Sequence, residues 1–144
     1  IFLFGGTLSL AKALETTGAG KLIADRVIGA LGENPSPVVF TFAVFILCCI
    51  MTNFMSNTAT TAMMAPICVS IAQGMGADPR AVLMACVIGG SCAYATPIGM
   101  PANTMVVGAG NYKFMNYVKA GMPLIVIATV ISMILLPIAF PFYP

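Results

Sequence analysis

The stretch Thr52-Asn53-Phe54-Met55-Ser56-Asn57-Thr58-Ala59-Thr60-Thr61 decides the fold of this chain, because it puts seven polar residues within ten positions. It lies near the middle of a segment, 38–73, that contains no charged residue. At about 1.5 Å per residue, one helix of that length exceeds a hydrocarbon core of about 30 Å. The segment is therefore expected to fold back or break, and the polar cluster marks the place.

The composition points to a membrane protein. Of 144 residues, 60% are apolar and 7% are charged, where soluble domains have about 25% charged residues. A net charge of +2 gives no field that would gather nucleic acid. The expected location is a plasma or inner membrane, crossed several times. The chain starts at Ile1 inside an apolar run and ends at Pro144, and we expect it to be a segment of a longer protein.

The titratable residues argue against an enzyme. The chain has no histidine, which removes a Ser-His dyad and a His-ligated zinc from this segment. Asp25 and Asp78 lie at segment ends, so no acidic pair or proton relay is expected at membrane depth. We expect no cofactor, and coupling by a metal cation. The five cysteines are predicted to be reduced packing residues: Cys48, Cys49, Cys68, Cys86 and Cys92.

The pattern along the chain predicts five segments. They are the end of an apolar helix at 1–14, an amphipathic interfacial helix at 21–32, a hairpin at 36–75 with its tip at 56–58, a helix at 79–119 that is unwound at 96–103, and a last membrane helix at 121–142. The Asp78-Pro79 pair predicts a helix start at Pro79. Beyond it, small residues recur every fourth position, at Ala81, Ala85, Gly89 and Ala93, which favours close helix packing in lipid.

Two irregular segments carry the candidate chemistry. Irregular backbone survives at membrane depth only where protein or a water-filled cavity satisfies it. Ser56-Asn57-Thr58 stands before a helix expected near Ala59, and 97–103 before one expected at Thr104 with Asn103 as its cap. Two such positive helix ends can converge on an anion. The hydroxyls, amides and freed carbonyls beside them are the oxygen ligands that sodium accepts. The pattern is typical of secondary transporters with broken helices.

Other interpretations stay open from the residues alone. Polar clusters in membrane helices often only bond a neighbouring turn or helix, and proline is often only a kink. Residues 38–54 and 59–75 can also each cross the membrane, with Ser56-Asn57-Thr58 as a surface loop. A passive anion channel and a structural membrane subunit are the alternative functions.

Several motifs together resemble the divalent-anion/sodium symporters, which carry succinate, malate, citrate or sulfate. They are Phe4-Gly5-Gly6-Thr7-Leu8-Ser9-Leu10-Ala11-Lys12-Ala13-Leu14, Ser56-Asn57-Thr58-Ala59-Thr60, Gly89-Gly90-Ser91-Cys92-Ala93, Pro101-Ala102-Asn103-Thr104 and Gly108-Ala109-Gly110-Asn111-Tyr112. The resemblance implies an all-α integral membrane fold that forms the C-terminal half of an inverted-repeat transporter, with a re-entrant helical hairpin and a broken transmembrane helix. It also implies an N-terminal repeat as partner, a homodimer, and a C-terminus outside the cytoplasm.

The resemblance further implies two binding sites. Sodium, the coupling ion, would be held by Thr52, Met55, Asn57 and Gly99, partly through backbone carbonyls. The small anionic substrate would meet Ser56, Asn57, Thr58, Met100 and Pro101. Many members have Thr-Pro-Pro-Asn where this chain has Met100-Pro101-Ala102-Asn103, so a hydroxyl that faces the substrate is replaced by Met100.

Overall fold

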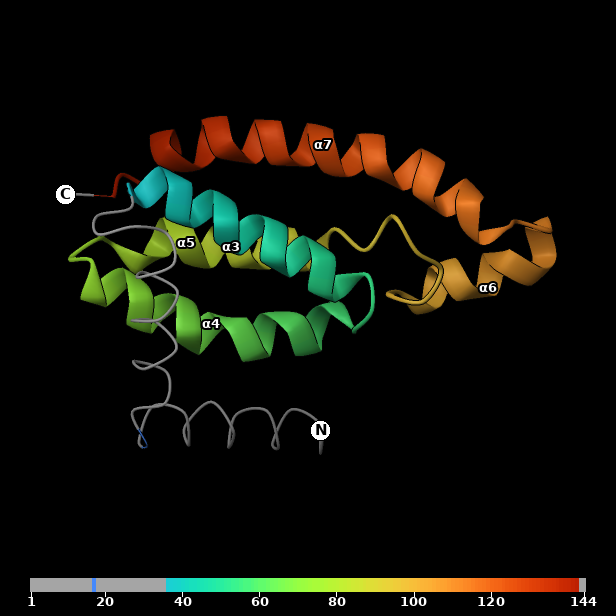
Figure 1. The fold of residues 1–144 in the computed structure, drawn as a ribbon, viewed down its shortest axis with the longest axis horizontal. Helices are drawn as coiled ribbons and strands as arrows, with labels where there is room; N and C mark the ends of the chain where they lie inside the picture. Colours follow the sequence, from blue (N-terminus) through green and yellow to red (C-terminus); the bar gives the residue numbers. More distant parts are fainter. Residues whose placement is uncertain (1–16, 18–35, 143–144) are drawn as a thin grey trace.

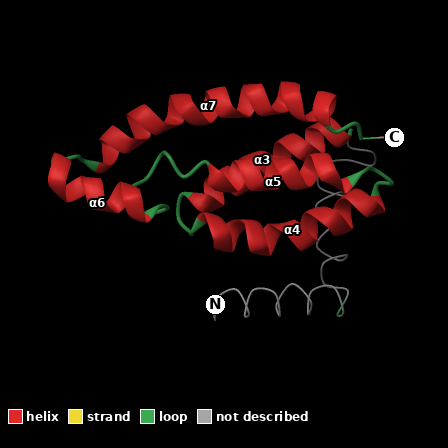
Figure 2. Ribbon diagram, turned by 180° about the vertical axis from the view of Figure 1, so that it is seen from behind, coloured by secondary structure: helices red, strands yellow, loops and turns green. Residues whose placement is uncertain are grey.

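The computed structural model describes residue 17 and residues 36–142, and every regular element among them is an α-helix. The helices are α3 (Pro37–Thr52), α4 (Asn57–Gly74), α5 (Pro79–Ser91), α6 (Pro101–Gly110) and α7 (Phe114–Ala139). Figures 1 and 2 show α3, α4 and α5 lying side by side, with the long α7 along them and α6 at one end. The predicted segments at 1–14 and 21–32 fall outside the described residues.

Helices α3 and α4 form an antiparallel pair joined by the short turn 53–56 (Figure 1). Each begins after a serine whose hydroxyl accepts a hydrogen bond from a free backbone amide: Ser36 from Val39 N (3.4 Å) and Ser56 from Ala59 N (3.3 Å). Such serine caps satisfy donors that the first helical turn leaves unpaired. With Ser56 as the cap, α4 begins at Asn57, slightly before the start predicted near Ala59.

Helix α5 begins at Pro79, as the Asp-Pro pair predicts. The Asp78 carboxylate accepts from Arg80 N (2.9 Å), which caps the helix. Hydrogen bonds from the Arg80 side chain to this carboxylate hold the pKa of Asp78 below its ordinary value. The carboxylate therefore stays ionised, and this end of α5 carries a neutral ion pair.

The small-residue face of α5 packs against α3. Ala81 and Ala85 are fully buried. A methyl group added at Gly89 would lie 2.7 Å from the carbonyl oxygen of Phe45, so the glycine allows the two backbones to approach closely. All five cysteines are buried and free, and Cys48, Cys68 and Cys86 lie in one apolar cluster with Phe40. Their burial confirms the predicted packing role.

The region after α5 differs from the prediction at both ends. Helix α5 ends at Ser91, and the irregular segment runs over 92–100 instead of 96–103. Asn103 is not the cap of the next helix: α6 begins at Pro101, and Met100 occupies the cap position without a side-chain bond. Proline fits the first helical turn because that position needs no amide donor. The Asn103 side-chain amide instead donates hydrogen bonds to backbone carbonyls of the 92–100 segment.

The last helix starts earlier than predicted. Helix α6 ends at Gly110, followed by Asn111 in a left-handed conformation (φ 50°), and α7 begins at Phe114, ahead of the predicted start at 121. Lys119 therefore lies inside α7 and does not close the preceding element. The prediction took Pro123 to mark the start of the last helix, but Pro123 lies inside α7. Membrane helices tolerate proline at internal positions. In the described part of the chain, α7 alone is long and apolar enough to cross a membrane.

Candidate functional site

Two helix C-termini meet where the α3–α4 turn approaches the end of α5. The hydroxyl oxygen of Thr52, the last residue of α3, lies 2.5 Å from Gly90 O of α5 and 2.8 Å from Oδ1 of Asn57, the first residue of α4. Thr52 is fully buried. Its single hydroxyl proton can serve only one of these two oxygens. The arrangement concentrates oxygen atoms beside the negative ends of two helix dipoles, an environment that favours a cation.

Asn53 joins the α3–α4 turn to the irregular segment 92–100. Its side-chain oxygen accepts from Ala95 N (3.0 Å), and its amide donates to Cys92 O (3.3 Å) and Cys49 O (2.6 Å). The side chain is 5% exposed. The bonds to Ala95 N and Cys92 O pair backbone groups that follow the end of α5 and have no helical partners, which explains why α5 can stop at Ser91.

Two further side chains, Thr96 and Asn103, hold the irregular segment. The Thr96 hydroxyl donates to Asn53 O (2.5 Å), and the Asn103 amide donates to Ala93 O (2.8 Å) and Thr96 O (3.1 Å). A methyl group added at Gly99 would overlap Thr52 O and lie 3.1 Å from the Cα of Asn53. Gly99 is therefore the position at which the segment rests directly on the backbone of the turn.

A cavity of about 500 Å³ opens between the turn and the start of α6. Its lining is uncharged and consists of Phe54, Met55, Ser56, Ile98, Gly99, Pro101, Thr104 and Met105. The N-termini of α4 and α6 both border it, through Ser56 and Pro101. Two helix N-termini at one cavity provide the positive dipole ends and free amides that bind anions.

The structure brings several predicted residues together. Met55, Ser56, Gly99 and Pro101 line this cavity, while Thr52 and Asn57 are not lining residues and contact each other through the Thr52 hydroxyl and the Asn57 side-chain oxygen. Thr58 and Met100 are exposed and are not among the lining residues.

The sequence did not show which residues hold the site together; their contacts assign this role to Asn53, Gly90, Thr96 and Asn103. The signal for Asn53 was present, because it is a buried amide at the end of an apolar helix, and such a group requires partners. The apolar part of the cavity lining, Phe54, Ile98 and Met105, was also missed. These side chains had no distinguishing pattern in a chain that is apolar almost throughout.

Irregular segments between helix ends, as found in the described part of this all-helical chain, are also the places where helical membrane transporters form their ligand sites. Comparison with known proteins gives the family. Residues 1–140 match the sodium:sulfate symporter transmembrane region, and the chain belongs to this family.

Individual relatives agree with this assignment. Over 142 residues, 99% of this chain and 23% of the relative, it is 36% identical to the uncharacterized transporter YfbS of Escherichia coli (strain K12). It is 28% identical over 143 residues, 96% of the chain and 27% of the relative, to the sodium-dependent dicarboxylate transporter SdcS of Staphylococcus saprophyticus. With the Na(+)/citrate cotransporter of Rattus norvegicus it shares 31% identity over 122 residues, 85% of the chain and 21% of the relative. The chain thus spans about a quarter of the length of these relatives.

Proposed function

We propose that this chain is the C-terminal repeat of a secondary transporter that couples sodium entry to uptake of a small divalent or dicarboxylate-like anion. The observation that carries the proposal is the pairing of helix ends. The C-termini of α3 and α5 meet at Thr52 and Gly90, while the N-termini of α4 and α6 border one uncharged cavity. These helix ends support a cation site next to an anion site, the arrangement of broken-helix ends that secondary transporters use for substrate and coupling ion.

In this proposal α3 and α4 form a re-entrant hairpin, and α5 and α6 form one broken membrane helix. A crossing takes about 20 helical residues, while α3 has 16, α5 has 13 and α6 has 10. Helix α7, with 26 residues, is long enough. An N-terminal repeat of inverted topology would supply the opposite hairpin and complete both sites, and the assembly would be a homodimer.

Charged residues lie at both ends of the bundle. The C-terminal end lies beside the α4–α5 turn, since Asp78 N donates to Phe142 O (2.8 Å), and it carries the Asp78–Arg80 ion pair. The opposite end has Lys113 and Lys119, and no acidic residue lies on the chain beyond Asp78. The proposed orientation, with the C-terminus outside the cytoplasm, rests on the family resemblance, and it puts these two lysines on the cytoplasmic side, where positive residues are common.

The ligand assignments in this proposal are those that the family resemblance implies. Sodium would bind oxygens of Thr52, Met55, Asn57 and Gly99, and a substrate carboxylate would bind at Ser56, Asn57 and Thr58, with Met100 and Pro101 beside it. Two relatives are named as a dicarboxylate transporter and a citrate cotransporter, which supports a carboxylate substrate. The family name, which includes sulfate, keeps a divalent inorganic anion among the candidates.

The test is uptake by the full-length protein in proteoliposomes. Labelled succinate, citrate and sulfate are supplied with an inward sodium gradient or with potassium in its place. Saturable uptake that requires sodium supports the proposal. Uptake that neither saturates nor depends on sodium indicates a passive anion channel, and no uptake of any of these anions indicates a structural subunit.

One substitution tests the shared position of the two ligands. Asn57→Ala should weaken both sodium activation and substrate affinity, each by roughly tenfold to over a hundredfold, the range for a lost hydrogen bond to a charged group. Asn116→Ala is the matched control, because Asn116 is an exposed asparagine of α7. Normal sodium activation and affinity in Asn57→Ala would show that this amide serves neither ligand.

A further inference from the structure

Helix α7 contacts the irregular segment 92–100 at one point where no side chain intervenes. Gly121 is buried in α7, and a methyl group added there would overlap the carbonyl group of Tyr94 and lie 2.6 Å from Ala95 N. These are backbone atoms, so the collision cannot be relieved by a side-chain rotation. Only glycine at this position lets α7 rest on the 94–95 peptide.

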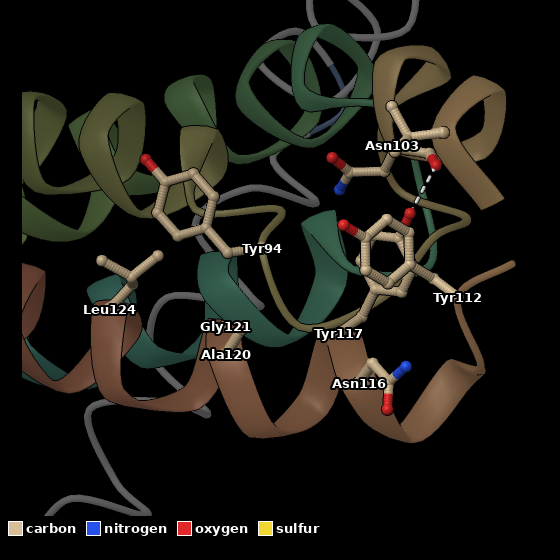
Figure 3. Close-up of a pocket in the computed structure, with 9 residues that line it drawn as sticks. Tyr94, Asn103, Tyr112, Asn116, Tyr117, Ala120, Gly121 and Leu124 are labelled. Atoms are coloured by element: carbon tan, nitrogen blue, oxygen red, sulfur yellow. Dashed lines mark hydrogen bonds between the residues drawn. The ribbon is translucent and has the colours of Figure 1, made fainter. Parts of the chain in front are cut away.

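A second contact between α7 and this region is a hydrogen bond. The Tyr117 hydroxyl, one turn before Gly121 on the same helix, donates to Asn103 O (2.8 Å) in the first turn of α6. Figure 3 shows Gly121 on α7 below Tyr94, and the dashed bond between Tyr117 and Asn103. A cavity of about 420 Å³ lies beside them, so neighbouring side chains do not fill this part of the interface.

Both contacts lead directly to the candidate ion site. Gly121 lies against Ala95 N, and this amide donates a hydrogen bond to Asn53 Oδ1. Asn53 is the first residue of the turn after Thr52. The carbonyl of Asn103 accepts the bond from Tyr117. The side-chain amide of Asn103 donates to Thr96 O, and Thr96 lies three residues before Gly99. A displacement of α7 would therefore move the backbone that carries the proposed ligand Gly99.

We infer that Gly121 and Tyr117 are positioning residues for the sodium site: α7 acts as a fixed support that sets the distance between the 92–100 segment and the α3–α4 turn. This inference rests on the proposed function, because it holds that Gly121 and Tyr117 influence sodium binding although neither residue contacts sodium or substrate. In it, α7 supports the coupling site in addition to crossing the membrane.

The test measures sodium half-saturation in the full-length protein by two methods, sodium-dependent uptake and the sodium-induced rise in melting temperature. Gly121→Ala should raise half-saturation by roughly two- to tenfold, the range for loss of one net hydrogen bond such as Ala95 to Asn53. Gly74→Ala is the matched control, because this helical glycine of α4 has no atom within 4 Å of an added methyl group.

Tyr117→Phe keeps the fold and removes only the hydroxyl bond, so it should shift sodium half-saturation in the same direction by a smaller factor. Its control is Tyr112→Phe, because Tyr112 packs edge-on against Tyr117 and is exposed. If the wild type responds to sodium and both Gly121→Ala and Tyr117→Phe respond with wild-type half-saturation, the positioning role is wrong while the proposed function stands. If the wild type itself shows no response to sodium by either method, both the proposed function and this inference are wrong.

Discussion

Asn53 offers the sharpest test of how the site is held together. Asn53→Ala removes the acceptor for Ala95 N and the donor to Cys92 O, both in a buried region where water is not expected to replace them. An unpaired buried polar group costs about 1–3 kcal/mol, so the pair amounts to roughly 2–6 kcal/mol. That is a large share of the about 5–15 kcal/mol that stabilises a typical protein.

The measurement is the melting temperature of the full-length protein, with sodium half-saturation as a second readout. Asn53→Ala should melt well below the wild type and require more sodium for half-maximal uptake. The matched control is Asn116→Ala, an exposed site where a change stays within about 0.5 kcal/mol. Equal melting temperatures for the two variants would refute the view that Asn53 holds the turn to the 92–100 segment.

Two more substitutions address the ligand sites. Gly99→Ala places a methyl group against Thr52 O, so sodium-dependent uptake should fall sharply while Gly74→Ala remains normal; wild-type sodium activation in Gly99→Ala would remove Gly99 from the ion site. Met100→Thr adds a hydroxyl at an exposed position beside Pro101. It should change relative uptake of succinate, citrate and sulfate more than it changes sodium half-saturation. If all three anions keep their rank and apparent affinity, Met100 does not face the substrate.

Local sequence chemistry predicted the elements whose ends are set by their own residues. The uncharged run with a polar centre predicted an interruption near 52–61, and the structure has a turn at 53–56, so the tip lies before the predicted 56–58 and Asn57 and Thr58 belong to the first turn of α4. Asp78-Pro79 predicted the start of α5, because capping depends on neighbouring side chains and backbone amides alone. The small residues Ala81, Ala85 and Gly89 marked a packing face, since close approach of helices requires small side chains wherever it occurs.

Only the tertiary structure decided where α5 ends and what Asn103 does. The end of α5 depends on Asn53, 39 residues away from Cys92 in the chain, whose side chain pairs the backbone groups that the helix gives up. Asn103 resembled a local cap, but the carbonyls freed in 92–100 compete for its amide and bind it. Gly121 looked like any glycine in an apolar helix until the 94–95 peptide was placed against it. Hydrogen bonds and contacts between distant segments leave no local pattern, so the sequence predicted the presence of the irregular segment and its polar groups, whereas the fold determined its boundaries and its partners.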